Sequence, residues 1–277
     1  MQSKRLMTAA VGIPLFFLLV QYLSPAWFCA FMVICAAVGQ WEFYRMFKNS
    51  GYNPQTAVGL FLGTLVIIGF YIGSTSSGRI VYVFSPDVLI AFAFAAALVF
   101  RLFSRRDTNG AMADVALTFT GVVYVAWLVA YVVLLRSWNL AGIDGRDLIF
   151  FLMFVTWATD TGAYYIGSYF GRHKLYPKIS PKKSIEGAIG GLVFAVGMAV
   201  ACTYWFYHEL PILDAIALGL ILGIIGQVGD LAESMIKRSA RVKDSGGVIP
   251  GHGGVLDRMD SILLNAPALY YYTVIMV

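Results

Sequence analysis

Apolar runs recur along the whole chain at the length that a membrane-crossing helix requires. Crossing the hydrocarbon takes about 20 mostly apolar residues, and the chain supplies about nine such runs. They lie near residues 6–23, 25–44, 56–73, 86–103, 114–135, 148–170, 187–206, 211–236 and 260–277. The period-two alternation of a membrane β-barrel is absent from these runs. The pattern therefore predicts an all-α, polytopic integral membrane protein with about nine transmembrane helices.

Composition and charge agree with this and add an orientation. The chain is 59% hydrophobic and only 13% charged. With a cytoplasmic N-terminus, alternating loops place all but three of the 20 Lys and Arg residues inside, the exceptions being Arg79, Arg136 and Arg146. That bias satisfies the positive-inside rule. We therefore expect a multi-pass membrane protein with a cytoplasmic N-terminus, whose net charge of +5 serves topology and anionic lipid or phosphate rather than nucleic acid.

The remaining features of the apolar runs predict packing. Glu42 and Arg45, at i and i+3 near the inner end of the second run, predict a local ion pair. Small residues at four-residue spacing, such as Gly187 with Gly191, predict close helix packing within the bundle and leave a homodimer open. The three cysteines, Cys29, Cys35 and Cys202, match no metal-ligand spacing and are expected to be buried.

Charge is concentrated in one stretch, residues 234–260, between two strongly apolar runs. It holds five Lys or Arg residues, three aspartates, one histidine and five glycines. Charge beside a bilayer is costly, so this mixture indicates a functional site rather than an anchor, which would be mostly Lys and Arg. It suits polyphosphate chemistry, because carboxylates hold a divalent cation, cations hold phosphate oxygens, and glycines let backbone N–H groups approach.

Helical spacing groups several of these side chains. Asp230, Glu233, Ser234 and Lys237 fall at i, i+3, i+4 and i+7 and share one helical face. Asp230 lies about two turns inside the charged end, so we expect a lysine, an arginine or a metal ion beside it. Asp257 and Asp260 share a face of the next helix, and the two carboxylate clusters are predicted to hold Mg²⁺. The alternative for Asp257 is a salt bridge with Arg258 that closes the loop.

The segment 251–254, GHGG, precedes that next helix. Its backbone N–H groups are expected to be free to bind an anion. His252 is expected to donate to a phosphate or to act as a general acid or base, although a lone histidine is a weak signal.

Two polar features precede the charged stretch. Asp160 lies with Thr156 inside the apolar sixth run, where it either lines the site or anchors neighbouring helices. The loop 171–187 carries five Lys and Arg residues before Glu186. This loop either attracts anionic lipid or, through the compact turn SPKKS, grips a phosphate.

The pattern of residues 234–260 resembles the signature of phosphatidate cytidylyltransferases, also called CDP-diacylglycerol synthases. The resemblance rests on Ser234, Lys237, Arg238, Lys243, Asp244, Pro250, His252, Gly253, Gly254, Asp257, Arg258 and Asp260. The stretches WATDTGAYYIG and SPKKSIEG are similar in kind. The resemblance implies that the cytidylyl group of CTP is transferred to phosphatidate, giving CDP-diacylglycerol and pyrophosphate in phospholipid biosynthesis.

The resemblance also implies roles for particular residues. The implied catalytic residues are Asp230, Lys237, Arg238, Lys243, Asp244, His252, Asp257 and Arg258. Substrate binding is expected from Ser234, Arg241, Gly253, Gly254, Asp160, Lys182 and Lys183. Asp230, Asp257 and Asp260 are the expected ligands of Mg²⁺, and a monovalent cation stays open. Residues 1–110 then form scaffold helices, and 111–277 a catalytic region with cytoplasmic loops 171–187 and 237–260, the site lying at the cytoplasmic ends of the C-terminal helices.

Two other functions remain open. A CTP-dependent lipid-alcohol kinase needs the same metal and phosphate contacts, but it would transfer the γ-phosphate. A transporter of an anionic solute would explain Asp160 and Asp230 in glycine-rich helices. The charge lies on one side rather than at the midplane, which favours the enzyme. The choice of cytosine over other bases rests on the resemblance alone.

Overall fold

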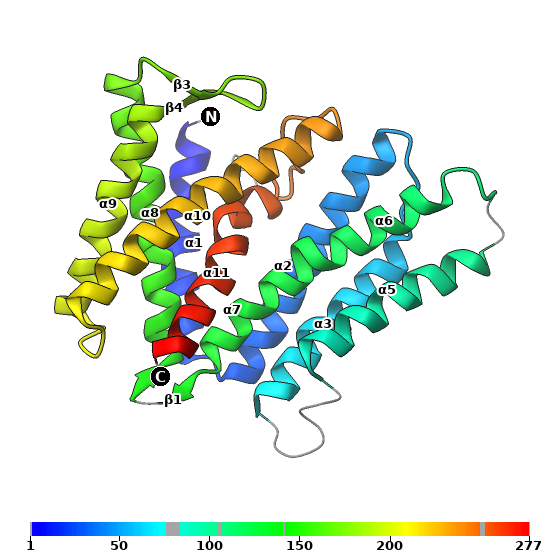
Figure 1. Cartoon of the computed structure of the whole chain (residues 1–277), viewed down its shortest axis with the longest axis horizontal. Coiled ribbons are helices and arrows are strands. Elements are labelled where there is room, and N and C mark those ends of the chain that lie inside the picture. The colour runs from blue at the N-terminus through cyan, green and yellow to red at the C-terminus, as the bar shows by residue number, and fades with distance from the viewer. Residues whose placement is uncertain (1, 76–83, 105–106, 141, 250–252, 277) are drawn as a thin grey trace. The chain divides into compact units, whose positions relative to one another are not determined.

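The computed structural model describes residues 2–75, 84–104, 107–140, 142–249 and 253–276, with backbone only at 2–9 and 11. The described chain is mostly helical, as Figure 1 shows. Its helices are α1 (Gln2–Tyr22), α2 (Pro25–Asn49), α3 (Thr56–Thr75), α5 (Pro86–Leu102), α6 (Ala111–Gly121), α7 (Leu128–Arg136), α8 (Gly145–Phe170), α9 (Ile185–Trp205), α10 (Ile212–Ser239) and α11 (Leu256–Met276). A π-helical turn, η1 (Val122–Trp127), joins α6 to α7. The predicted apolar runs therefore fall on helices.

Two short antiparallel hairpins interrupt the helices and were not predicted. Strand β1 (Asn139–Leu140) pairs with β2 (Ile143–Asp144), and β3 (Lys174–Tyr176) pairs with β4 (Ser180–Ser184). The segment SPKKS, expected to be a turn, is therefore strand β4. Helix α9 follows directly, and the Ser184 hydroxyl caps it by accepting from Gly187 N–H.

Membrane-spanning character is clearest for five helical segments of the described chain. They are Pro25–Asn49, Thr56–Thr75, Ala111–Arg136, Ile185–Trp205 and Ile212–Ser239, each long and apolar enough to cross a membrane. Helix α5 has 17 residues, and α8 carries Asp160 and several threonines within its apolar run. A multi-pass membrane protein is thus confirmed, while the number of nine spans stays a prediction.

The chain forms two compact units. The first comprises residues 1–137 and 239–258, and the second comprises 138–238 and 259–277. The loop that follows α10 thus belongs to the same unit as the N-terminal helices. This division follows packing, so the functional division near residue 110 stays a prediction.

In the first unit, α2 makes polar contacts with α3 and α6 deep among apolar side chains. The Gln40 amide donates to the carbonyl oxygens of Gly59 and Gly121, and the Tyr44 hydroxyl donates to that of Thr118 at 2.7 Å. Gly59 and Gly121 leave no space for a side chain, because an added Cβ would overlap the Tyr44 ring. Each polar group is thereby satisfied away from water, as an apolar environment requires.

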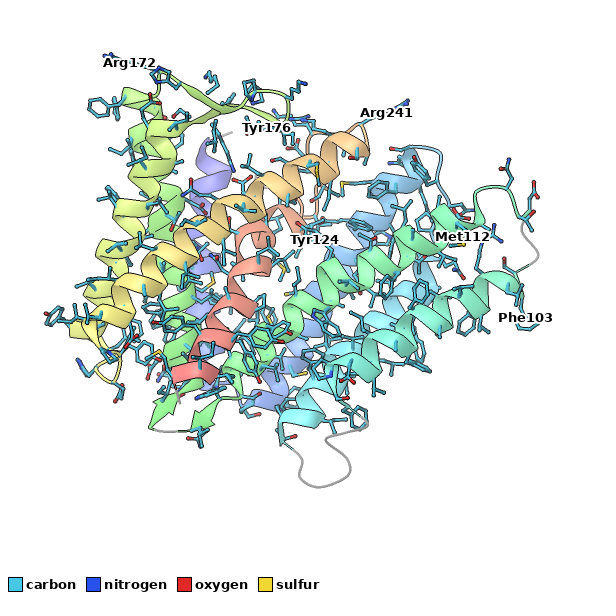
Figure 2. The ribbon with its side chains drawn as sticks, in the orientation of Figure 1. Phe103, Met112, Tyr124, Arg172, Tyr176 and Arg241 are labelled. Atoms are coloured by element: carbon cyan, nitrogen blue, oxygen red, sulfur yellow. The ribbon has the colours of Figure 1, made fainter. Side chains whose placement is uncertain are left out.

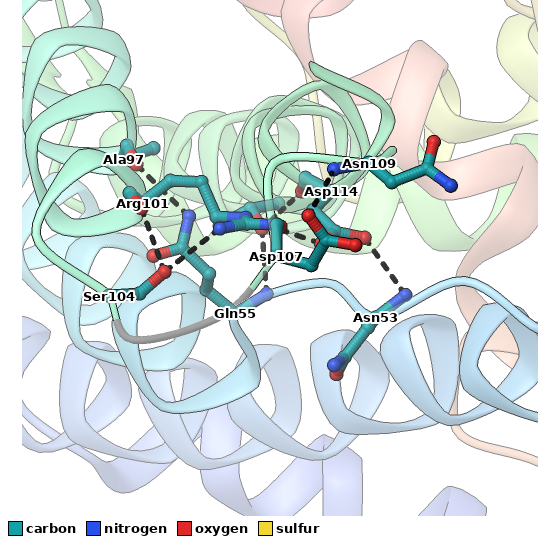
Figure 3. A network of polar contacts seen from close by, with 9 residues as sticks. Asn53, Gln55, Ala97, Arg101, Ser104, Asp107, Asn109 and Asp114 are labelled. Carbon is teal, nitrogen blue, oxygen red and sulfur yellow. Dashed lines mark hydrogen bonds and ion pairs between the residues drawn. The ribbon is translucent and has the colours of Figure 1, made fainter. Parts of the chain in front are cut away.

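A second polar network ties α5 to α6 and to the segment before α3 (Figure 3). Arg101 Nε lies 3.3 Å from Asp114 Oδ2, and both side chains are less than a tenth exposed. The other guanidinium nitrogens donate to the Ser104 hydroxyl and to the Asp107 carbonyl oxygen, while Asn53 N–H donates to Asp114 Oδ1. Neither of these two buried networks was predicted from the sequence.

In the second unit, glycines bring helices into close contact. Helices α8 and α9 lie side by side (Figure 1), and an added Cβ on Gly187 would lie 2.8 Å from the Ala163 carbonyl oxygen. Gly219 of α10 is equally close to the backbone of Val196 in α9. The Asn265 amide of α11 donates to the Thr156 hydroxyl of α8 at 3.1 Å. The predicted close packing through small residues is confirmed.

Candidate active site

The C-terminal part of α10 and strand β4 bring several predicted site residues together within the second unit. Lys183 Nζ lies 2.7 Å from Asp230 Oδ2, and the Ser234 hydroxyl donates to the other oxygen of the same carboxylate at 3.4 Å. Both side chains of the ion pair are partly exposed, Lys183 by 25% and Asp230 by 32%. The cation expected beside Asp230 is therefore Lys183, which comes from the basic loop 171–187 rather than from α10 itself.

One turn further along α10, Lys237 pairs with Glu233 at 2.5 Å. Glu233 is completely buried, whereas Lys237 is 13% exposed. A buried carboxylate requires such a partner, because desolvation of an unpaired charge is expensive. The predicted polar face of this helix is thus real, and its members are already arranged in pairs.

The β3–β4 hairpin is ordered by contacts at both its ends. The backbone N–H groups of Arg172 and His173 donate to the Glu186 carboxylate, and His173 Nδ1 lies 2.6 Å from Glu186 Oε1. Arg238 of α10 donates to the Ile179 carbonyl oxygen at the hairpin turn. Arg172 extends outward from the ribbon in Figure 2. These contacts hold the β3–β4 hairpin in place, and phosphate binding by this loop stays a prediction.

Exposed cations follow the end of α10, in the first unit. Arg241, Lys243 and Arg258 are all exposed. Arg241 has φ of 55°, the left-handed conformation that commonly ends a helix, and its side chain points away from the ribbon (Figure 2). Such accessible charges can contact phosphate oxygens.

Asp257, in the first turn of α11, closes the loop that contains Arg241 and Lys243. Its carboxylate accepts from the backbone N–H of Ser245, at 3.1 and 3.2 Å, and from that of Gly254 at 2.8 Å. The side chain is almost buried, with 8% exposure. The loop-closing role considered for Asp257 is therefore real, and the contacts that show it are made with backbone N–H groups of the loop.

Glu42 of α2 is the residue that sequence reasoning missed. Its Oε2 accepts from Leu256 N–H at 2.9 Å and from the Ser245 hydroxyl at 3.3 Å, and the residue is completely buried. The predicted ion pair with Arg45 is wrong: within the described chain, Arg45 is exposed and lies over the Trp41 ring instead. No local signal identified Glu42, because its partners lie more than 200 positions away.

Some of the backbone N–H groups that were expected to be free to bind an anion already donate to carboxylates. Gly254 N–H and Leu256 N–H bind Asp257 and Glu42, since both carboxylates reach the start of α11. His252 and Gly251 lie outside the described residues. Gly253 has φ of 86°, which explains a glycine there.

The other predicted residues are placed as follows. Asp160 is exposed on α8, Lys182 is exposed on β4, and Asp244 is exposed in the loop after α10. Asp260 is partly buried at the start of the second turn of α11, where its carboxylate accepts from Ser261 N–H. None of their expected roles is tested by these positions. Cys29 and Cys202 are buried and Cys35 is half-buried, all as free thiols, which agrees with packing.

The carboxylates present suit Mg²⁺ in donor type. The described residues contain no ready-made group of three or more Asp, Glu, His or Cys side chains. Mg²⁺ commonly needs only one or two carboxylates, because substrate phosphates and waters complete its octahedron. Asp230 presents a partly exposed carboxylate, and Asp257 presents one that backbone N–H groups of the loop after α10 hold in place.

The fold defines a polytopic membrane protein, and its described side chains include paired carboxylates in one unit and exposed cations in the other. Residues 3–276 match the model of the cytidylyltransferase family, and the chain belongs to that family. It is 32% identical to a phosphatidate cytidylyltransferase of Synechocystis over 304 aligned positions, which cover 100% of this chain and 98% of that protein.

Two further relatives with the same name match over shorter stretches. The chain is 39% identical to the Bacillus subtilis protein over 158 residues, 57% of this chain and 58% of that protein. It is 43% identical to the Staphylococcus haemolyticus protein over 156 residues, 56% of this chain and 58% of that protein. These two matches therefore span a little over half of each relative.

Proposed function

We propose that this protein is a phosphatidate cytidylyltransferase, which converts phosphatidate and CTP to CDP-diacylglycerol and pyrophosphate. The observation that carries the proposal is the similarity, over its whole length, to a protein of that name. The arrangement of Lys183, Asp230 and Lys237 on one surface supports it, because phosphate oxygens need nearby cations.

In the proposed reaction, a phosphatidate phosphate oxygen attacks the α-phosphorus of CTP. The new P–O bond forms as the bond to the β-phosphate oxygen breaks, and pyrophosphate leaves. Phosphatidate is already anionic, so no deprotonating base is required, and His252 needs no catalytic role. The protein's contribution is to orient the two phosphates and to neutralise their charge.

The proposed phosphate contacts come from exposed cations and from lysines that neighbouring carboxylates hold in place. The exposed side chains of Arg241, Lys243 and Arg258 are available to contact triphosphate and lipid phosphate. Lys183 and Lys237 are held near carboxylates, which fixes their ammonium groups before substrate arrives. We expect the lipid tails to remain among the helices while the head group lies at the interface.

Mg²⁺ is part of the proposal. Asp230 and Asp257 are the proposed ligands, with Asp260 and Asp244 in reserve, and bound Mg²⁺ would neutralise nucleotide phosphate charge. The excess of Lys and Arg on one side supports a cytoplasmic N-terminus and site in the plasma membrane, with nine spans. A monovalent cation and a homodimer stay open.

Labelled CTP tests the proposal. Purified protein is supplied with Mg²⁺, phosphatidate and CTP labelled at either the α- or the γ-phosphate. We expect label from the α position in lipid with release of pyrophosphate, both abolished by Asp257→Ala. Label from the γ position in lipid would instead identify a kinase. Absence of transfer with any nucleotide in folded protein would favour an anion transporter.

A further inference from the structure

The buried carboxylate of Glu42 lies against the described parts of the loop that joins α10 to α11. Two donors converge on Oε2: the Leu256 N–H at 2.9 Å and the Ser245 hydroxyl at 3.3 Å. The other oxygen, Oε1, is buried and makes no hydrogen bond among the described residues. A carboxylate so placed costs free energy by desolvation, so its retention here requires a reason beyond local stability.

The loop backbone closes around this carboxylate. An added Cβ on Gly254 would lie 2.5 Å from Glu42 Oε2, and one on Gly246 would overlap Oε1. Both glycines are therefore needed for the backbone to approach Glu42. The loop is held a second time by α2, since the Ser50 hydroxyl just after that helix donates to the Ala240 carbonyl oxygen at 2.6 Å.

The same short segment holds Asp257. Ser245 donates through its hydroxyl to Glu42 and through its backbone N–H to Asp257, so one residue connects the two carboxylates. Leu256, whose N–H binds Glu42, directly precedes Asp257 in the chain. The position of Asp257 is thereby coupled to that of Glu42 from both sides.

We propose that Glu42 is a positioning residue for cytidylyl transfer, which fixes the loop after α10 and so sets the place of Asp257. This inference rests on the proposed function, in which Asp257 is a ligand of the Mg²⁺ that neutralises nucleotide phosphate charge. Glu42 itself touches neither. The N-terminal helices are then part of the catalytic apparatus rather than a scaffold alone.

The test compares three variants. Glu42→Ala removes both accepted hydrogen bonds and leaves two buried donors unpaired. Glu42→Gln keeps an oxygen at Oε2 that can accept both. Gln40→Leu is the matched control, because Gln40 is buried in the same helix but bonds to Gly59 and Gly121 instead.

For Glu42→Ala we expect kcat to fall roughly 10- to 100-fold, the range set by an unpaired buried donor. The Mg²⁺ concentration for half-maximal rate should also rise, which loss of folded protein alone would not produce. Glu42→Gln should stay within about fivefold of the native rate, and Gln40→Leu should keep the native Mg²⁺ requirement at equal folded yield. An unchanged rate in Glu42→Ala would overturn the proposal. The same rise in Mg²⁺ requirement in Gln40→Leu would also overturn it. Equal losses of rate in Glu42→Gln and Glu42→Ala would do so as well.

Hydrogen exchange separates this inference from the proposed function. The amides of Ser245, Gly254 and Leu256 should exchange faster in Glu42→Ala but not in Gln40→Leu, whether or not the protein transfers cytidylyl groups. Native protein that lacks transfer contradicts the proposed function, whereas unchanged exchange in Glu42→Ala contradicts the role of Glu42.

Discussion

Adjacent glycines offer a matched pair of substitutions in the loop after α10. An added Cβ on Gly246 would overlap the Glu42 carboxylate and lie 2.8 Å from its Cδ, whereas one on Gly247 would meet nothing within 4 Å. Neither glycine has a positive φ, so alanine is conformationally acceptable at both. Gly246→Ala and Gly247→Ala therefore differ in contact with Glu42 and in little else.

The size of the effect of Gly246→Ala depends on which part of the protein must move to accommodate the added Cβ. Glu42 is completely buried, so its side chain cannot swing into solvent, and the loop must shift instead. The shift strains the Leu256 and Ser245 hydrogen bonds to Oε2. Overpacking and a lost buried hydrogen bond each cost about 1–3 kcal/mol. We expect a total of about 2–6 kcal/mol in the loop, equivalent to a loss of rate of roughly 30-fold or more.

The assay is formation of CDP-diacylglycerol from labelled CTP and phosphatidate in mixed micelles, with thermal unfolding of each variant recorded in parallel. Gly247→Ala should retain at least about half the native rate, since exposed substitutions rarely exceed about 0.5 kcal/mol. A Gly246→Ala rate within threefold of the native rate, or equal impairment of both variants, would contradict the predicted clash with Glu42.

Three other outcomes are expected. EDTA should stop transfer and added Mg²⁺ should restore it; transfer that survives chelation contradicts the metal assignment. Asp230→Asn should lower the rate at least about 100-fold. The free energy of unfolding should change by no more than about 1 kcal/mol, because the ion pair of Asp230 with Lys183 is partly exposed. Asp114→Ala should destabilise the protein by about 3–5 kcal/mol by leaving Arg101 buried and unpaired, whereas the double variant Arg101→Met, Asp114→Leu should recover most of that stability in a denaturant titration.

Local patterns predicted the helices well. The apolar runs fall on helices because a segment in lipid must satisfy its own backbone, so length and composition are enough. Helical spacing likewise placed Asp230 beside Ser234 and Lys237 beside Glu233, and the structure contains both contacts. Periodicity could do this because these partners lie within one or two turns of the same helix.

Long-range partners could not be predicted in this way. Lys183 was expected to serve substrate, but nothing in the spacing connected it to Asp230, 47 positions away. Glu42 was paired with Arg45, the nearest opposite charge on its helix, although its donors come from the loop after α10. The hairpin β3–β4 was missed because its strands are too short for a periodic signal.

The separation between Glu42 and its donors has a consequence for biogenesis. Helix α2 leaves the ribosome early, while Ser245 lies 203 residues further along the chain and Leu256 lies 214. During that interval the nascent protein must carry a carboxylate near the membrane without its eventual hydrogen bonds. Assembly of the loop is therefore a late event, and a ribosome stalled before residue 245 would leave an inserted but inactive intermediate with an exposed acidic group on α2 for quality control to recognise.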